Sequence, residues 1–145
     1  MQTGEYNDAI AILLMRTVTG ILFFFQGYDK LFNVKIANVV RTFSEPLSKF
    51  RISQSFLKPS IALSSVIELV CGILLFIGLG KNISLYFLAI DLIFVAFIFS
   101  SMKAMWDMQY FFPRLLLIVI LLFCLPEQDL FSLDNLLNFS IKVGQ

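Results

Sequence analysis

The hydrophobic residues of this chain form four long blocks instead of alternating with polar residues at short range. The blocks run from about Ala9 to Tyr28, Pro59 to Leu79, Ile83 to Met102 and Phe111 to Leu125. About 20 apolar residues in a helix cross a hydrocarbon core of roughly 30 Å. The pattern therefore predicts an all-α fold in which four transmembrane helices form a bundle, with residues 1–145 as a single transmembrane domain.

The first block has a competing interpretation as a signal peptide. The segment before it carries Glu5 and Asp8 but no Lys or Arg, and no small-x-small cleavage site follows the block. Signal peptides begin with positively charged residues and end at such a site. We therefore expect the first block to be a permanent transmembrane helix.

The connections between the blocks differ in length. Only Gly80, Lys81 and Asn82 separate blocks two and three, so these blocks are expected to form a helical hairpin. Blocks one and two are joined by about thirty residues with an amphipathic pattern. Apolar residues recur there at helical spacing at Ile36, Val39, Val40, Phe43, Leu47 and Phe50, opposite Lys35, Asn38, Arg41 and Ser48. This pattern predicts an interfacial helix broken at Pro46, whose basic face lies against anionic headgroups or binds a specific ligand.

The end of the chain predicts a short surface helix. Pro126 is expected to end the fourth span, after which Glu127, Gln128 and Asp129 reach water. Ser132 resembles an N-cap. The apolar face that follows consists of Leu133, Leu136, Leu137 and Ile141. Asp134 falls in the first turn of this helix, where the helix dipole favours a carboxylate, so we expect it to have a structural role.

Composition strengthens the membrane interpretation and narrows the chemistry. The chain is 59% hydrophobic and 14% charged, whereas average soluble domains have roughly 45–50% apolar and 25% charged residues. Its net charge of +1 provides no broad basic surface for nucleic acid. It contains no histidine, which excludes His-ligated metal sites and His-based nucleophile pairs. We expect no metal site and no intrinsic cofactor, so any redox chemistry must use a bound molecule.

The two cysteines are expected to be buried small hydrophobic residues. Cys71 and Cys124 lie in separate apolar blocks and do not form a C-x-x-C motif. Counting the helix rise from the same membrane face places Cys71 about 12 Å deep and Cys124 within a residue or two of that face. This separation is too large for a disulfide.

Three ionisable residues lie deep inside their blocks: Arg16, Glu68 and Asp91. At about 1.5 Å per residue their depths are roughly 10, 16 and 12 Å from one membrane face, which brings both carboxylates within reach of the arginine. Small residues nearby, Gly20 beside Arg16 and Ser64 and Gly72 beside Glu68, favour close helix packing. Two carboxylates facing one arginine would share a proton. The triad is either a structural ion network or a site for a proton or a polar ligand.

A second group of polar residues gathers near the other membrane face. Asp29 and Lys30 close the first block, while Lys103, Trp106, Asp107 and Arg114 surround the third loop. Trp and long basic side chains are typical of membrane interfaces. Anchoring to headgroups is the simpler interpretation of this group, and a binding site is the alternative.

Several motifs in the chain resemble the DoxX family of small bacterial membrane proteins. Arg16-x-x-x-Gly20 followed by Gln26-Gly27-Tyr28-Asp29-Lys30-Leu31 resembles the first span of that family. Glu68 with Gly72 and Gly78-Leu79 resembles its second span and turn, and Ser132-Leu133-Asp134 resembles its motif after the last span. Trp106-Asp107 with Phe112-Pro113-Arg114 resembles one branch. The family often has histidine at the position of Gln26, and Asp91 is outside the family pattern.

The resemblance implies a redox-associated role in the bacterial cytoplasmic membrane. Members of the family include the membrane subunit of thiosulfate:quinone oxidoreductases and membrane partners of thiol-redox or superoxide-detoxifying proteins. By position, the residues to examine are Arg16, Gln26, Lys30, Glu68 and Asp134. A quinone-like or other lipid molecule is the expected ligand, and an oxidoreductase or thiol-redox protein is the expected partner. The sequence also allows a homo-oligomer. The alternative function is a membrane scaffold or small transporter whose buried charges are structural.

The distribution of basic residues predicts the topology. Six Lys and Arg residues lie between Lys30 and Lys58 and Lys103 lies in the third loop, whereas Lys81 and Lys142 are isolated. The positive-inside rule places both termini outside the cytoplasm. A periplasm-specific reporter fused after Gln145 should be active, with the same reporter inserted after Lys49 as the inactive control. A cytoplasm-specific reporter that is active after Gln145 would contradict the prediction.

Overall fold

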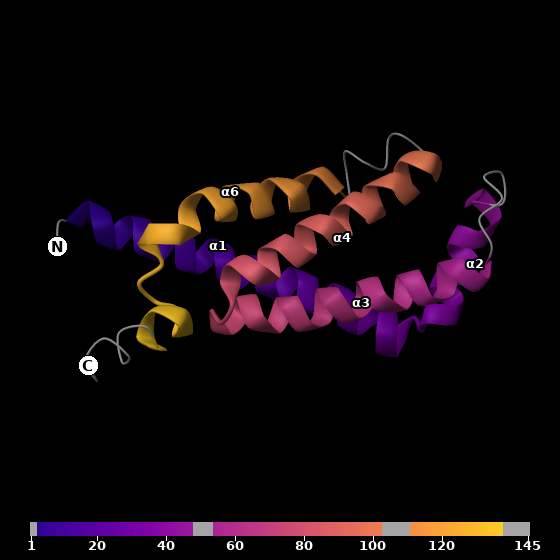
Figure 1. The fold of residues 1–145 in the computed structure, drawn as a ribbon, viewed down its shortest axis with the longest axis horizontal. Helices are drawn as coiled ribbons and strands as arrows, with labels where there is room; N and C mark the ends of the chain where they lie inside the picture. The colour runs from indigo at the N-terminus through magenta and orange to yellow at the C-terminus, as the bar shows by residue number, and fades with distance from the viewer. Residues whose placement is uncertain (1–2, 48–53, 103–110, 138–145) are drawn as a thin grey trace.

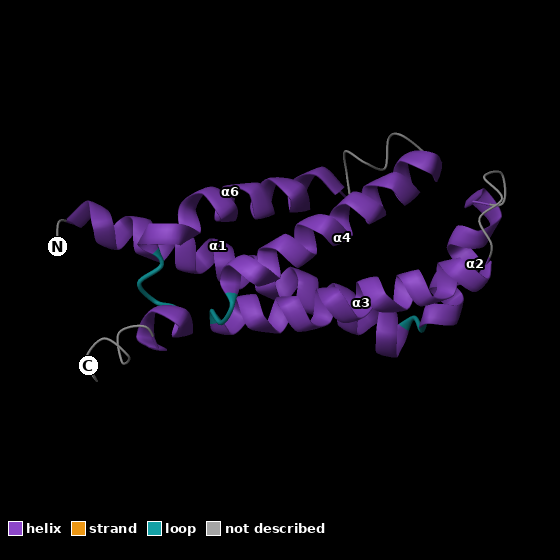
Figure 2. Ribbon diagram, viewed as in Figure 1, coloured by secondary structure: helices purple, strands orange, loops and turns teal. Residues whose placement is uncertain are grey.

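The computed structural model describes residues 3–47, 54–102 and 111–137, and the elements in these ranges are helices and turns without any strand (Figure 2). This confirms the all-α prediction. The helices are α1 (Thr3–Tyr28), the π-helix η1 (Asp29–Asn33), α2 (Ile36–Leu47), α3 (Gln54–Ile77), α4 (Lys81–Met102) and α6 (Phe112–Gln128). A single further turn of helix covers residues 133–137.

The four long helices lie roughly along one axis (Figure 1). α1 packs against α3 and α6, and α4 packs against the same two helices. Leu75, Leu88, Leu92, Ile118 and Leu121 are buried where the helices meet. α2 lies at one end of the bundle, and residues 129–137 lie at the other end (Figure 1). The chain thus places a polar segment at each end of an apolar bundle.

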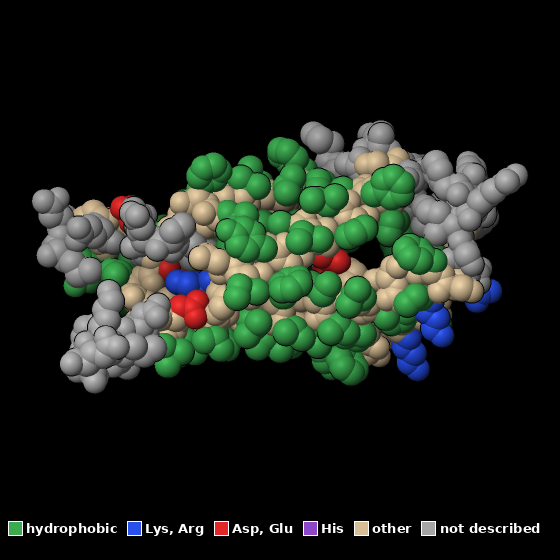
Figure 3. All heavy atoms as spheres, viewed as in Figure 1, with side chains coloured by type: hydrophobic (Ala, Val, Ile, Leu, Met, Phe, Trp, Pro, Cys, Tyr) green, Lys and Arg blue, Asp and Glu red, His purple; other side chains and the backbone are tan. Residues whose placement is uncertain are grey.

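Three helices are long and apolar enough to cross a membrane: Tyr6–Asn33, Ser55–Ile77 and Lys81–Ile98. A shorter apolar helix covers Phe112–Cys124. Hydrophobic side chains cover most of the visible middle of the molecule, whereas Lys and Arg side chains gather at its ends (Figure 3). Such an apolar exterior is expected when the surrounding solvent is lipid.

Both prolines that were expected to interrupt helices lie inside them. α2 continues through Pro46 to Leu47, and α6 continues through Pro126 to Gln128, so the predicted helix ends are wrong by one or two residues. α3 likewise begins at Gln54, five residues before Pro59. A proline ring removes one hydrogen bond, but its fixed φ is helical, so a helix can include a proline near its end.

α2 confirms the predicted separation of polar and apolar residues. Ile36, Val39, Val40 and Phe43 pack against Leu57, Ile61 and Ile98 of α3 and α4. Lys35, Asn38 and Arg41 are exposed on the other side. Phe50 and Ser48 lie outside the described residues. The apolar face of α2 therefore contacts the end of the bundle itself.

The turn between α3 and α4 depends on backbone conformations that favour glycine. Gly78 and Gly80 have φ values of 77° and 58°. The amides of Gly78 and Leu79 both donate to the Leu74 carbonyl, at 2.9 Å each, which satisfies an acceptor at the end of α3. This geometry confirms the predicted hairpin.

Gly20 and Gly72 allow a close contact between α1 and α3. A Cβ atom added at Gly20 would lie 2.8 Å from the Gly72 carbonyl oxygen and 2.7 Å from the Phe76 amide nitrogen. This confirms that small residues allow the helices to approach, and it sets the register between α1 and α3. Cys71 and Cys124 are both free thiols, as expected.

Replacing Gly20 with alanine should destabilise the bundle. Because the new methyl group would overlap backbone atoms of α3, which cannot rotate away, we expect Gly20→Ala to lower the free energy of unfolding by about 1–3 kcal/mol. Gly4→Ala is the matched control, since a Cβ atom there would have no neighbour within 4 Å. Thermal unfolding in detergent measures the difference. Equal unfolding temperatures for the two variants would contradict the proposed close contact.

Candidate functional site

Arg16 is almost fully buried, with 1% of its surface exposed, at the end of the bundle opposite α2. Its Nη1 donates hydrogen bonds to the carbonyls of Leu75 and Phe76, the latter at 3.0 Å, and its Nη2 donates to the Phe131 carbonyl at 3.1 Å. Its Nε lies 3.1 Å from Oδ2 of Asp129. One guanidinium group thus joins α1, the end of α3 and the segment after α6.

The same cluster also holds the beginning of α4. Lys81 Nζ lies 3.1 Å from Asp129 Oδ2 and donates to Ser132 Oγ at 2.8 Å. The Asp134 carboxylate accepts hydrogen bonds from the amides of Gly80 and Lys81, at 2.9 and 3.1 Å. We call Arg16, Lys81, Asp129, Ser132 and Asp134 the clamp. It satisfies polar groups at the ends of α3 and α4, which lack partners within their own helices.

Two expectations for the last segment are modified by the clamp. Ser132 does cap the short helix, because its Oγ accepts a hydrogen bond from the Asn135 amide at 3.2 Å. Asp134 has a structural role as expected, but it caps the neighbouring helix α4 instead of its own. Asp129, which was expected to reach water, is buried between Arg16 and Lys81.

The predicted triad of Arg16, Glu68 and Asp91 is wrong, because Arg16 pairs with Asp129. The register brings Gly20 opposite Phe76, which is eight residues and so about 12 Å along α3 from Glu68. Side chains of a helix also point towards its N-terminus. The long Arg16 side chain therefore extends away from Glu68, towards the turn after α3.

Lys30 is the cation that pairs with Glu68. Its Nζ donates to both carboxylate oxygens of Glu68, at 2.8 and 2.6 Å. The Glu68 side chain is fully buried, whereas that of Lys30 is 23% exposed. Lys30 lies in η1, and Gly27, just before it, faces Ser65 and Leu69 of α3. Because its side chain also points back along its helix, Lys30 reaches the level of Glu68.

The position of Lys30 in a π-helix is informative. An inserted π turn changes the direction in which following side chains point, and such turns are frequent at functional sites. Among the described helices, η1 is a π-helix that covers Asp29–Asn33. The sequence contains no feature that predicts it.

Asp91 and Arg114 complete a group of four charged residues. Asp91 accepts a hydrogen bond of 3.0 Å from Ser64 Oγ and interacts electrostatically with Lys30 and Glu68. Arg114 interacts electrostatically with Glu68 from α6. Within the described ranges, its Nη1 is buried without a hydrogen-bond partner. We call Lys30, Glu68, Asp91 and Arg114, together with Ser64, the polar core.

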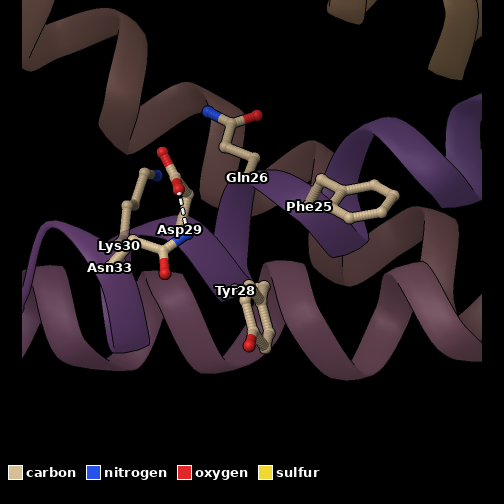
Figure 4. A pocket seen from close by; sticks show the side chains of 6 residues that line it. All are labelled: Phe25, Gln26, Tyr28, Asp29, Lys30 and Asn33. Carbon is tan, nitrogen blue, oxygen red and sulfur yellow. Dashed lines mark hydrogen bonds between the residues drawn. The ribbon is translucent and has the colours of Figure 1, made fainter.

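An open pocket of about 390 Å³ adjoins Lys30. Figure 4 shows the residues that line it, with the Gln26 amide and the Lys30 side chain extending on the same side of the helix. The Asp29 carboxylate accepts a hydrogen bond of 2.6 Å from Asn33 at its edge. The aromatic rings of the lining come from Phe25 and Tyr28. The pocket therefore combines apolar walls with an ammonium group, a combination common in small-molecule sites.

Part of the second predicted polar group lies beyond the described residues. Lys103, Trp106 and Asp107 belong to that part, so the structure provides no test of their roles. Asp29, Lys30 and Arg114 are described, and only Lys30 and Arg114 are part of the polar core. In the described ranges, no group of three or more Cys, Asp and Glu side chains could hold a metal ion.

Comparison with known families gives an identification. The DoxX family model matches residues 11–101, which is well over half of the chain. The chain belongs to the DoxX family. With three helices long and apolar enough to span a membrane, it is a multi-pass membrane protein. No curated protein and no solved structure matches the chain.

The motifs that resemble the DoxX family divide between the two clusters. Arg16 and Asp134 belong to the clamp, and Lys30 and Glu68 form the central pair of the polar core. Arg16 and Asp134 have a structural role, because each of them satisfies a helix end or a buried charge. Lys30 and Glu68 bury a charge pair beside a pocket, which no helix end requires.

Sequence reasoning missed the roles of Asp129, Lys81 and Ser64. Because both residues lie between apolar blocks, Asp129 was expected to reach water and Lys81 was expected to lie in a turn. Ser64 was treated as a small packing residue, whereas its hydroxyl donates to Asp91. One signal was available: Ser64 and Glu68 are four residues apart and therefore share a helix face.

The clamp predicts a large stability effect at Arg16. Arg16→Gln removes the hydrogen bonds to three carbonyls and the ion pair with Asp129, so we expect the free energy of unfolding to fall by about 3–5 kcal/mol. Lys81→Gln should cost less, because Arg16 still pairs with Asp129. Arg41→Gln on the exposed side of α2 is the neutral control. Thermal unfolding in detergent tests the order, and an Arg16→Gln protein as stable as the control would refute the clamp.

Proposed function

We propose that this DoxX-family protein is a redox-associated membrane subunit that binds a quinone-like or other lipid ligand at the Lys30–Glu68 pair and serves a partner oxidoreductase. One observation carries this proposal. A buried carboxylate and a partly exposed ammonium group are paired at 2.6 Å beside a pocket with aromatic walls. A purely structural pair gains nothing from an open pocket at its cation.

The chemistry of the pocket suits a ring with carbonyl oxygens. An ammonium group has three N–H donors, and Glu68 accepts from Lys30 through two oxygens. The remaining donor is available to a ligand oxygen at the exposed side of Lys30. Aromatic rings continue along the same helix, where Tyr28 stacks on Phe24 and lies 4.9 Å from Phe32. A quinone head would contact Phe25 and Tyr28 in the lining of the pocket and meet Lys30 there.

The electrons for such a reaction come from a partner in this proposal. The sequence has no histidine to ligate a metal, and its two cysteines are free and lie in different helices. The chain would therefore position the ligand and handle protons, while an oxidoreductase or thiol-redox protein supplies the electrons. The roles we propose for this chain are ligand binding, ligand orientation and proton transfer.

The proposal includes a placement in the bacterial cytoplasmic membrane. The 17-residue helix α6, Phe112–Gln128, would be the fourth crossing, supported by its packing against α1 and α4. α2 would lie at the cytoplasmic interface, where exposed Lys35, Arg41 and Lys58 face anionic headgroups. Both termini would then be outside, at the end of the bundle that carries the clamp.

A membrane scaffold or small transporter is the alternative function. If Asp91 were ionised, Lys30 and Arg114 would offset Glu68 and Asp91, and this balanced network would favour the scaffold. Ion-dependent flux into vesicles that contain the purified protein would support a transporter. If the protein showed neither ion flux nor quinone binding, the scaffold function would be favoured.

The pair of Lys30 and Lys35 offers a matched test of binding. Lys30→Gln should weaken binding of a short-chain ubiquinone to the detergent-purified protein about 10-fold, because one charged hydrogen bond to the ligand is lost. Lys35→Gln should bind like the parent, since that side chain is exposed outside the pocket. Equilibrium titration measures both affinities, and mass spectrometry identifies lipids that co-purify. Equal binding by the parent and Lys30→Gln proteins would refute the proposed site.

A further inference from the structure

The two carboxylates of the polar core are held differently. Glu68 receives two hydrogen bonds from the Lys30 ammonium group, at 2.6 and 2.8 Å. Within the described residues, Asp91 receives one hydrogen bond, from the neutral hydroxyl of Ser64 at 3.0 Å. Both carboxylates are more than nine-tenths buried. Among the described residues, Glu68 is therefore the carboxylate of the polar core that is bonded directly to a cation.

Two charged groups of the polar core interact with Asp91. Lys30 faces it from η1 but is bonded to Glu68, which itself faces Asp91 from α3. Arg114 of α6 interacts with Glu68, and the Cys71 thiol of α3 also faces Asp91. Two neighbouring carboxylates in a low-dielectric site share a proton, and the one without an ionic partner keeps it. This rule assigns the charge to Glu68 and the proton to Asp91.

The location of Asp91 also differs from that of Glu68. Asp91 retains 5% of its exposure and Glu68 retains none. Ser64 is one helical turn from Glu68 on the same face of α3, and its hydroxyl donates to Asp91 on α4. A hydroxyl both donates and accepts, which allows it to pass a proton.

We propose that Asp91 is a neutral carboxylic acid in the resting protein and is the residue through which protons enter the polar core. Its protonated state follows from the packing alone. Its role in reduction rests on the proposed function. Conversion of one quinone to quinol takes two electrons, supplied by the partner oxidoreductase, and two protons. The Asp91 proton would pass by way of Ser64 to the ionised Glu68, which would release it to the reduced ligand. Asp91 would then take up the next proton from outside, and two such cycles would supply both protons.

Infrared spectroscopy of the full-length protein in lipid nanodiscs, without quinone, tests the protonated state. The parent at neutral pH should show a carbonyl stretching band of a buried carboxylic acid that shifts when the protein is exchanged into D₂O. Asp91→Asn should remove this band, whereas Asp29→Asn, in an exposed carboxylate bonded to Asn33, should retain it. A parent without the band, or an Asp91→Asn protein that keeps it, would overturn the proposal.

A kinetic measurement tests the role in proton delivery. In native membranes, Asp91→Asn should reduce the maximal rate of partner-linked quinone reduction about 100-fold without raising KM for the quinone, because the proton supply is lost and the binding site is intact. An unchanged rate in the presence of the band would show that Asp91 is protonated but carries no protons, which overturns the second half of the proposal. Loss of quinone binding in the parent would instead contradict the proposed function, while the infrared result stands.

Discussion

An ionised side chain in a hydrocarbon environment must find charged or hydrogen-bonding partners, because leaving it without them costs several kcal/mol. The arrangement of this bundle follows from how that requirement is met at its two polar clusters. Arg16 is the clearest case, since its guanidinium group is surrounded by three carbonyls and one carboxylate. The carbonyls at the end of α3 also need donors, so a single residue satisfies the buried charge and the helix end together.

The polar core meets the same requirement differently. Lys30 and Glu68 satisfy each other, and Asp91 accepts a hydrogen bond from a hydroxyl. Among the described residues, both clusters contain buried polar atoms without a hydrogen-bond partner: Nη1 of Arg114 in the polar core, and Arg16 Nε and Asp129 Oδ1 in the clamp. The pocket beside Lys30 distinguishes the polar core and is the physical basis for placing ligand binding and proton handling there.

Helix geometry links the two clusters. Arg16 and Lys30 are 14 residues apart in the sequence, about four helical turns, so both face α3. Both side chains extend towards the N-terminus of their helix. The contact between Gly20 and Gly72 sets the register, which takes Arg16 to the turn after α3 and Lys30 to Glu68. A shift of one helical turn along α3 would separate both cations from their partners.

Much of the architecture could be predicted from the sequence. Long apolar blocks determine membrane-spanning helices, because hydrocarbon accepts only segments whose backbone groups are satisfied internally. The hairpin at Gly78–Gly80, the cap at Ser132 and the small-residue contact at Gly20 also follow from local rules. The sequence also identifies Arg16, Lys30, Glu68 and Asp91 as residues that need partners, because charged groups have a high free energy in a membrane.

Which charge meets which could not be predicted in this way. Depth counted along separate helices placed Arg16 near Glu68, but it omitted the register between α1 and α3 and the direction of each side chain. It also omitted Asp129, whose position depends on how the chain folds back after α6 onto the end of the bundle. The sequence by itself determined the helices and the set of buried charges, since these depend on local composition and period. Only the tertiary structure decided the pairs, because an ion pair a few ångströms long depends on how helices far apart in the chain pack together.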